Sequence, residues 1–292
     1  RFDSTCSAED NEAGECFGGV ARVHTKINEL RDRIVSEGGN VIVLDAGDQF
    51  QGSLMYTTYK GAAEAEFMNM IGFDAMVVGN HEFDDGPEKL AEFADLVEFP
   101  VVSGNLDLSQ SNLLNGKVEN HVVLEVGGER IGIISALAAD TVETSSPGPN
   151  VIFQDEIDSL AADVATLESD GVTKVIAVTH VGLPKDIEIA AAVRGVDAIV
   201  GGHSHSYLSA SDPERQGPYP TWVSQEDGTL VPVVQAYAYS KYVGHLVLEF
   251  DDAGDLIHAE GDTIVLDASV EENPDVVARV AELAGPIEDL KA

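Results

Sequence analysis

Basic residues are scarce in this sequence. Its 292 residues include 16 lysines and arginines against 52 aspartates and glutamates, a formal net charge of −36. So acidic a chain repels phosphate backbones and anionic lipids, which makes nucleic acids and such membranes poor partners. The acidic residues are spread along the whole chain. A dispersed acidic surface is typical of proteins from a high-salt environment, where salt screens the self-repulsion, and an ordinary acidic exported protein is the alternative.

Cysteine and long apolar runs are also scarce. The two cysteines, Cys6 and Cys16, flank a short acidic segment, and no second ligand pair lies near them to make a zinc site. A disulfide between them implies an oxidising compartment and is the interpretation we favour over two free thiols in a cytosolic loop. No apolar run is long enough to span a bilayer. Since no signal peptide is visible, we expect an exported protein to carry this sequence in its mature form.

Patterns typical of helices and strands alternate over the first two thirds of the chain. Apolar residues recur at helical spacing in segments 18–39, 61–73, 87–97, 155–171 and 186–195. Apolar runs that predict strands lie in segments 41–48, 74–84, 99–106, 174–182 and 196–207. Three later expectations are a hairpin over 121–137 turning at Gly127-Gly128, consecutive strands over 231–266, and a helix over 274–292. This order predicts an α/β fold with helices outside mixed sheets.

Four of the predicted strands run directly into side chains that can bind metal ions. In chain order these are Asp48, Asn80 with His81, His180, and His203 with His205. Sites in such folds lie beyond the carboxyl ends of strands, so we expect these residues close together. Mixed oxygen and imidazole donors suit zinc, manganese or iron better than calcium. Each donor alone has an ordinary interpretation as a turn, cap or hydrogen-bonded residue, but four in succession favour a metal centre.

These motifs resemble those of the calcineurin-like metallophosphoesterases. The sequence has Asp48 in a Gly-Asp pair, then Gly-Asn-His-Glu around His81, a later His180, and Gly-His-Ser-His around His203, in the family's order and spacing. The likeness is closest to the 5′-nucleotidases, and among them to ecto-5′-nucleotidases, on segments such as VIVLDAGDQFQGSLMYTTYKG and VRGVDAIVGGHSHSYL. It extends over nearly the whole chain. It implies a four-layer α/β/β/α sandwich around two divalent ions, zinc, manganese or similar.

The resemblance also implies a ligand set. Asp48 would bridge the two ions, Asn80, His180 and His203 would hold the second ion, and His205 would hold the first.

A catalytic pair is implied in the same way. His81 resembles the family's catalytic histidine, and Asp84 resembles the aspartate that holds it. A cationic His81 would stabilise the transition state or protonate the leaving oxygen while a water attacks phosphorus in line.

Two parts of the family pattern are missing from this sequence. The first motif, Asp-x-His, would lie just ahead of Arg1, and we expect it to precede the chain rather than to have been lost. Residues 1–270 are expected to be the catalytic domain and 271–292 the start of a linker helix. The resemblance implies a C-terminal nucleotide-binding domain beyond that helix, outside this sequence, through which a homodimer would form.

The resemblance therefore predicts an enzyme that hydrolyses nucleoside 5′-monophosphates to nucleoside and phosphate. Alternatives from the same family are a 2′,3′-cyclic nucleotide phosphodiesterase with 3′-nucleotidase activity and a nucleotide-sugar hydrolase. An extracellular module without catalysis, lacking the first metal, is the alternative of another class. Cys6 and Cys16 match a short disulfide loop of ecto-5′-nucleotidases, which favours a secreted, periplasmic or cell-surface protein.

Overall fold

The computed structural model describes residues 2, 9, 13 and 15–291. The helices are α2 (Val20–Ser36), α3 (Leu54–Tyr59), α4 (Ala62–Ile71), the 3₁₀ turn η1 (His81–Phe83), α5 (Pro87–Leu96), α6 (Thr141–Thr144), α7 (Glu156–Ser169), α8 (Leu183–Ala192) and α9 (Pro274–Lys291). The strands are β1 (Leu44–Asp45), β2 (Ala75–Val77), β3 (Val101–Val102), β4 (Leu106–Asp107), β5 (Val118–Glu119), β6 (His121–Val126), β7 (Glu129–Leu137), β8 (Ile152–Phe153), β9 (Lys174–His180), β10 (Ala198–Gly201), β11 (Thr221–Ser224), β12 (Leu230–Val234), β13 (Tyr242–Phe250) and β14 (Leu256–Val265).

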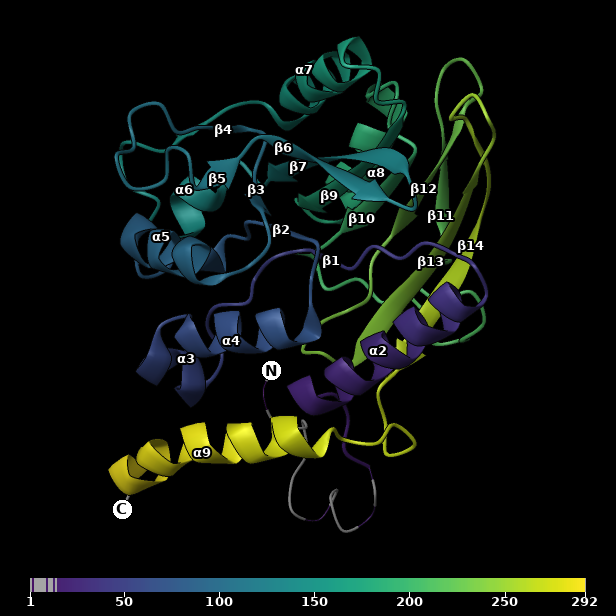
Figure 1. The fold of residues 1–292 in the computed structure, drawn as a ribbon. Coiled ribbons are helices and arrows are strands. Elements are labelled where there is room, and N and C mark those ends of the chain that lie inside the picture. Colours follow the sequence, from purple (N-terminus) through teal and green to yellow (C-terminus); the bar gives the residue numbers. More distant parts are fainter. Residues whose placement is uncertain (1, 3–8, 10–12, 14, 292) are drawn as a thin grey trace.

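Two sheets organise the fold (Figure 1). The four-stranded sheet has the order β1-β2-β3-β5 with every pair parallel. The six-stranded sheet has the order β11-β12-β10-β9-β7-β6, in which the four central strands are parallel and the two edge strands antiparallel. Parallel neighbours end at the same edge of a sheet, so each sheet gathers the loops that follow its strands at one edge.

The two sheets pack face to face, with helices on the outside. Val77 of β2 and Val102 of β3 are completely buried against Ile133 of β7 and Val178 of β9. Because successive side chains of a strand point to opposite faces, the neighbours of these residues face outward. The outward side chains of the four-stranded sheet pack on α4 and α5, and those of the six-stranded sheet pack on α7 and α8. The predicted four-layer α/β/β/α sandwich is confirmed.

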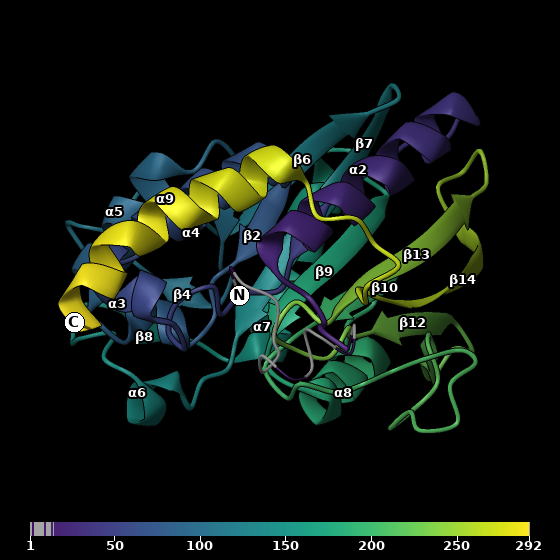
Figure 2. The ribbon, with the colours of Figure 1, turned by 90° about the horizontal axis from the view of Figure 1, so that it is seen from below.

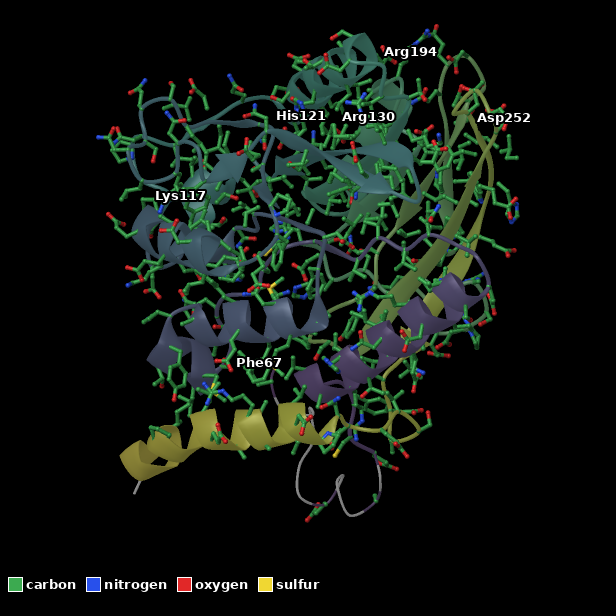
Figure 3. All side chains as sticks on the ribbon, viewed as in Figure 1. Phe67, Lys117, His121, Arg130, Arg194 and Asp252 are labelled. Carbon is green, nitrogen blue, oxygen red and sulfur yellow. The ribbon has the colours of Figure 1, made fainter. Side chains whose placement is uncertain are left out.

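A third group of elements covers one side of the sandwich. The hairpin β13–β14 forms its own two-stranded sheet, and α2 packs against β13 and α4. In Figures 1 and 2, α9 runs alongside α3 and α4. Phe67 of α4 lies on the side that faces α9 (Figure 3), in an apolar cluster with Val276 and Val280. The Arg279 guanidinium holds the Glu66 carboxylate through two hydrogen bonds of 2.6 and 3.1 Å.

The β6–β7 hairpin is confirmed at the predicted turn. Val126 pairs with Glu129, and the two residues between them, Gly127 and Gly128, have φ of +61° and +86°. Both central positions of this tight turn need a left-handed backbone, which glycine adopts at little cost.

The strands predicted over 231–266 divide between two sheets. β12 joins the six-stranded sheet beside β10, whereas β13 and β14 pair only with each other. The helix α3 and the edge strand β11 were not predicted. Among the described residues, no helix has both the length and the apolar character needed to cross a bilayer. Cys16 is buried, but Cys6 lies outside the described residues, so the disulfide stays a prediction.

Candidate metal centre

The structure brings Asp48, Asn80, His180 and His203 together where strands of both sheets end. Oδ2 of Asp48 lies 3.0 Å from Nε2 of His180. Oδ1 of Asn80 lies 3.1 Å from the same nitrogen and 3.0 Å from Nδ1 of His203. Asp48, His180 and His203 each offer one ligand atom, and these three atoms all lie within 4.8 Å of one another. The structure thus brings together four of the six side chains that were expected to lie close together, and their role as metal ligands stays a prediction.

The hydrogen-bond geometry of His180 indicates that the cluster suits a cation. Its Nδ1–H donates to the carbonyl of Ala46 at 2.6 Å, so in the neutral imidazole Nε2 carries a lone pair. That lone pair, the Asp48 carboxylate and the Asn80 carbonyl oxygen then point at one another, an arrangement that only a positive charge stabilises. Burial opposes a charge on His180, but the hydrogen bond and charge of Asp48 raise its pKa above the ordinary value. The donor set fits a divalent ion such as zinc or manganese.

A tight turn after β1 presents Asp48 to this cluster. Gly47 and Asp48 both have a left-handed backbone, with φ of +85° and +64°. The turn packs so closely on Gly79 that a Cβ there would lie 2.3 Å from Oδ1 of Asp48. That same Oδ1 accepts a hydrogen bond of 2.9 Å from the backbone N–H of His81. Glycine is therefore required where the loops after β1 and β2 meet.

The carboxylate of Glu82 fastens these two loops to each other. Its side chain is completely buried and accepts four backbone hydrogen bonds, from Gly79 and Asp48 on one oxygen and from Gln49 and Phe50 on the other. The four distances are 2.7 to 3.0 Å. The sequence motif gives no sign of this role, because the partners of Glu82 on the first loop lie more than thirty residues away.

His81 faces outward beside the cluster and is held by Asp84. Its Nδ1–H donates to Oδ2 of Asp84 at 2.6 Å, and 45% of the His81 side chain is exposed. Burial works against a charge on the imidazole, but the hydrogen bond to Asp84 and the charge of Asp48 raise the pKa of His81. The Ser145 hydroxyl donates to the other oxygen of Asp84 at 2.7 Å. Ser145 lies 61 residues beyond Asp84, so no sequence pattern could have connected the two residues.

His205 is placed differently from the other predicted ligands. It is exposed, its ring centroid lies 5.3 Å from that of Tyr239, and it is not in the close group formed by Asp48, His180 and His203 within the described part of the chain. Its role as a ligand stays a prediction.

A cavity of about 1380 Å³ lies over the cluster. Its lining includes Asp48, His81, His180, His203 and His205, together with apolar side chains of α2 and β13. Asp48, His180, His203, His205 and His81 therefore line one space that is large enough for a nucleotide.

A family model for calcineurin-like phosphoesterases matches residues 18–207, a range that contains the whole cluster. The chain belongs to this family. Calcineurin-like phosphoesterases use divalent metals, in agreement with the donor set. The predicted family is thus confirmed.

Individual members of the family are similar along most of the chain. A 5′-nucleotidase of Diplobatis ommata is 44% identical over 282 residues, which cover 93% of this chain and 48% of that protein. The human 5′-nucleotidase is 42% identical, with 92% of this chain and 47% of that protein covered. The crystal structure of a 5′-nucleotidase precursor from Thermus thermophilus superimposes with a TM-score of 0.90 at 39% identity, covering 94% of this chain and 54% of that one. The chain spans about half the length of these relatives.

Proposed function

We propose that this chain carries the catalytic domain of a metal-dependent 5′-nucleotidase, which hydrolyses nucleoside 5′-monophosphates to nucleoside and phosphate. The observation that carries the proposal is the convergence of Asp48, Asn80, His180 and His203 beside the half-exposed imidazole of His81. The identity of 42 to 44% with two 5′-nucleotidases supports the substrate class.

Two divalent ions, zinc or manganese, would complete the centre. Asp48 would contact both ions, Asn80, His180 and His203 would hold one of them, and His205 would contribute to the other. When bound, such ions supply positive charge for the phosphate and lower the pKa of water so that it can attack at neutral pH.

The residues around the ions would complete the reaction. The hydrogen bond to Asp84 occupies Nδ1 of His81 and leaves Nε2 as the only nitrogen that can meet a substrate. Burial opposes a charge on His81, but the hydrogen bond to Asp84 and the charge of Asp48 raise its pKa, which favours the protonated imidazole. It would donate that proton to the nucleoside oxygen as the bond to phosphorus breaks. Ser145 would keep Asp84 in place for this step.

We further propose that the chain has two parts and works outside the cytoplasm. Residues 1–270 would form the catalytic domain and 271–292 the start of a linker to a nucleotide-binding domain. A disulfide between Cys6 and Cys16 would place the protein in an oxidising compartment outside the cytoplasm. Mass spectrometry of peptides prepared without reduction tests the pairing, because a disulfide joins the peptides of Cys6 and Cys16.

Phosphate release from four substrates tests the activity. The protein is loaded with Mn²⁺ or Zn²⁺ and given AMP, 3′-AMP, cyclic 2′,3′-AMP or a UDP-sugar, the last two with a phosphatase in a coupled assay. We expect AMP to be hydrolysed fastest, with activity lost in EDTA and restored by metal. Faster turnover of the cyclic nucleotide or the UDP-sugar would identify the alternative family activities. Binding of a single ion without hydrolysis of any substrate would support the alternative of a module that lacks the first metal and does not catalyse.

A further inference from the structure

We propose that Gln235 is a positioning residue of the candidate metal centre, because its buried amide holds the loop that carries His203. This inference rests on the metal binding proposed above but not on the choice of substrate. Gln235 follows β12 directly. Since Val200 of β10 pairs with Val234 of β12 in parallel register, Gln235 lies beside the point where β10 runs into the loop.

The Gln235 amide connects the two ends of this loop. Its Nε2 donates to the carbonyl of Gly202 at 3.0 Å, and its Oε1 accepts from the backbone N–H of Ser206 at 2.5 Å and from the hydroxyl of Ser204 at 3.2 Å. The side chain is 2% exposed. A rotated amide would place its NH₂ group against the N–H of Ser206, so one orientation alone satisfies both ends.

The loop needs such a support because its backbone is strained. His203 and His205 have φ of +72° and +52°, in the left-handed region that residues other than glycine rarely adopt. Each such residue costs on the order of 1–3 kcal/mol and persists only where surrounding contacts hold it. A Cβ at Gly202 would lie 2.7 Å from the carbonyl oxygen of Ala46, the group that also fixes the His180 ring. A small movement of the loop would therefore withdraw His203 from the other ligands.

A second buried glutamine provides the matched control. Gln225 is 6% exposed, and its Nε2 donates to the carbonyls of Ala190 and Val193 at 2.8 Å, at the end of α8. It holds a helix end rather than a loop with candidate ligands. Gln235→Met and Gln225→Met thus remove similar buried amides, one next to the centre and one away from it.

Binding of Mn²⁺ to the folded protein, measured by calorimetry and by electron paramagnetic resonance, tests the inference. We expect Gln235→Met to weaken Mn²⁺ binding by ~10–100-fold, as is typical when a group that supports a ligand is removed. Gln225→Met should lower the melting temperature of the metal-free protein but leave Mn²⁺ affinity within about twofold of the wild type. In the Co²⁺-loaded protein, the visible absorption bands should change for Gln235→Met and not for Gln225→Met.

Three results would overturn the inference. The Mn²⁺ affinity of Gln235→Met could equal that of the wild type, the Mn²⁺ affinity of Gln225→Met could fall as much as that of Gln235→Met, or the wild-type protein could bind no Mn²⁺. If Gln235→Met does not fold, Gln235→Glu replaces it, because glutamate keeps the acceptor for Ser206 and loses the donor to Gly202. Unchanged Mn²⁺ affinity in Gln235→Glu would also overturn the inference. A wild type that binds Mn²⁺ but does not hydrolyse AMP would refute the proposed activity and leave the role of Gln235 intact.

Discussion

Oδ2 of Asp48 lies 3.0 Å from Nε2 of His180, although Asp48 follows a strand of the four-stranded sheet and His180 ends a strand of the six-stranded sheet. The candidate centre therefore joins the two halves of the sandwich. An ion bound by both residues would connect the sheets and stabilise only the folded protein. We expect saturating Mn²⁺ to raise the melting temperature, and EDTA to reverse the rise in a thermal scan.

Replacing Asp48 tests this connection directly. Asp48→Ala removes the only carboxylate of the cluster, so we expect Mn²⁺ affinity to fall by more than ~100-fold and hydrolysis of AMP to be lost. The rise in melting temperature with Mn²⁺ should be lost as well. Normal metal content in this variant, by elemental analysis, would contradict the assignment.

His81→Ala should separate catalysis from metal binding. The imidazole touches Asp84 and solvent rather than the clustered ligand atoms, so metal content should match the wild type. Turnover of AMP should fall by about 10²–10⁴-fold, the usual contribution of a general acid. Metal loss in His81→Ala as large as in Asp48→Ala would show that the roles are assigned wrongly.

Glu82→Gln should destabilise the loops that hold Asp48. The amide NH₂ would face two of the four backbone N–H groups that now donate to the carboxylate. Buried donors without acceptors cost about 1–3 kcal/mol each, so urea unfolding of the metal-free variant should show a loss of ~2–5 kcal/mol. Glu98→Gln, at an exposed position, controls for the removed charge and should unfold like the wild type.

Stability should depend on pH through Asp186. Burial raises the pKa of this carboxyl to about 7, and its Oδ2 has no hydrogen-bond partner among the described residues. The folded state then binds the proton more tightly than the unfolded state does. Ionisation of Asp186 therefore lowers the free energy of unfolding: the loss is complete above about pH 7 and disappears toward pH 4. Asp186→Asn should therefore be more stable than the wild type at pH 8, by up to ~4 kcal/mol.

Unfolding of both proteins in urea between pH 4 and pH 8 measures this difference. The Asp186→Asn variant keeps an acceptor for the Thr179 hydroxyl, which now donates to Oδ1 of Asp186 at 2.5 Å. Asp252→Asn, at the tip of the β13–β14 hairpin (Figure 3), controls for the loss of one charge. If the free energies of unfolding of Asp186→Asn and the wild type differ by the same amount at pH 4 and at pH 8, the prediction is contradicted.

The net charge of −36 leads to a prediction about salt. Screening lengths fall from ~10 Å at 0.1 M to ~3 Å at 1 M, which weakens repulsion between acidic side chains. We expect the melting temperature to rise by several degrees between 0.1 and 2 M KCl. Sucrose at equal osmolality, which leaves charges unscreened, should raise it less. A melting temperature independent of KCl would argue against adaptation to high salt.

Local sequence determined much of the fold and of the site. Apolar runs that end in Asp48, Asn80, His180 and His203 were enough to predict strands with candidate ligands at their carboxyl ends. Helices and the β6–β7 turn followed from spacing, because the period of apolar residues selects the element and the face it buries. The four layers followed from the resemblance to the family.

Only the tertiary structure determined what supports those ligands. Glu82, Ser145 and Gln235 act through contacts that join loops from separate strands. His205 lies outside the close group of described residues although it follows the same strand as His203. The tertiary structure also determined that the last strands divide between two sheets. The physical reason is that spacing along the chain determines which side chains leave a strand together. Which loops then meet depends on how the two sheets pack. That packing is determined by contacts among many residues that lie far apart in the sequence.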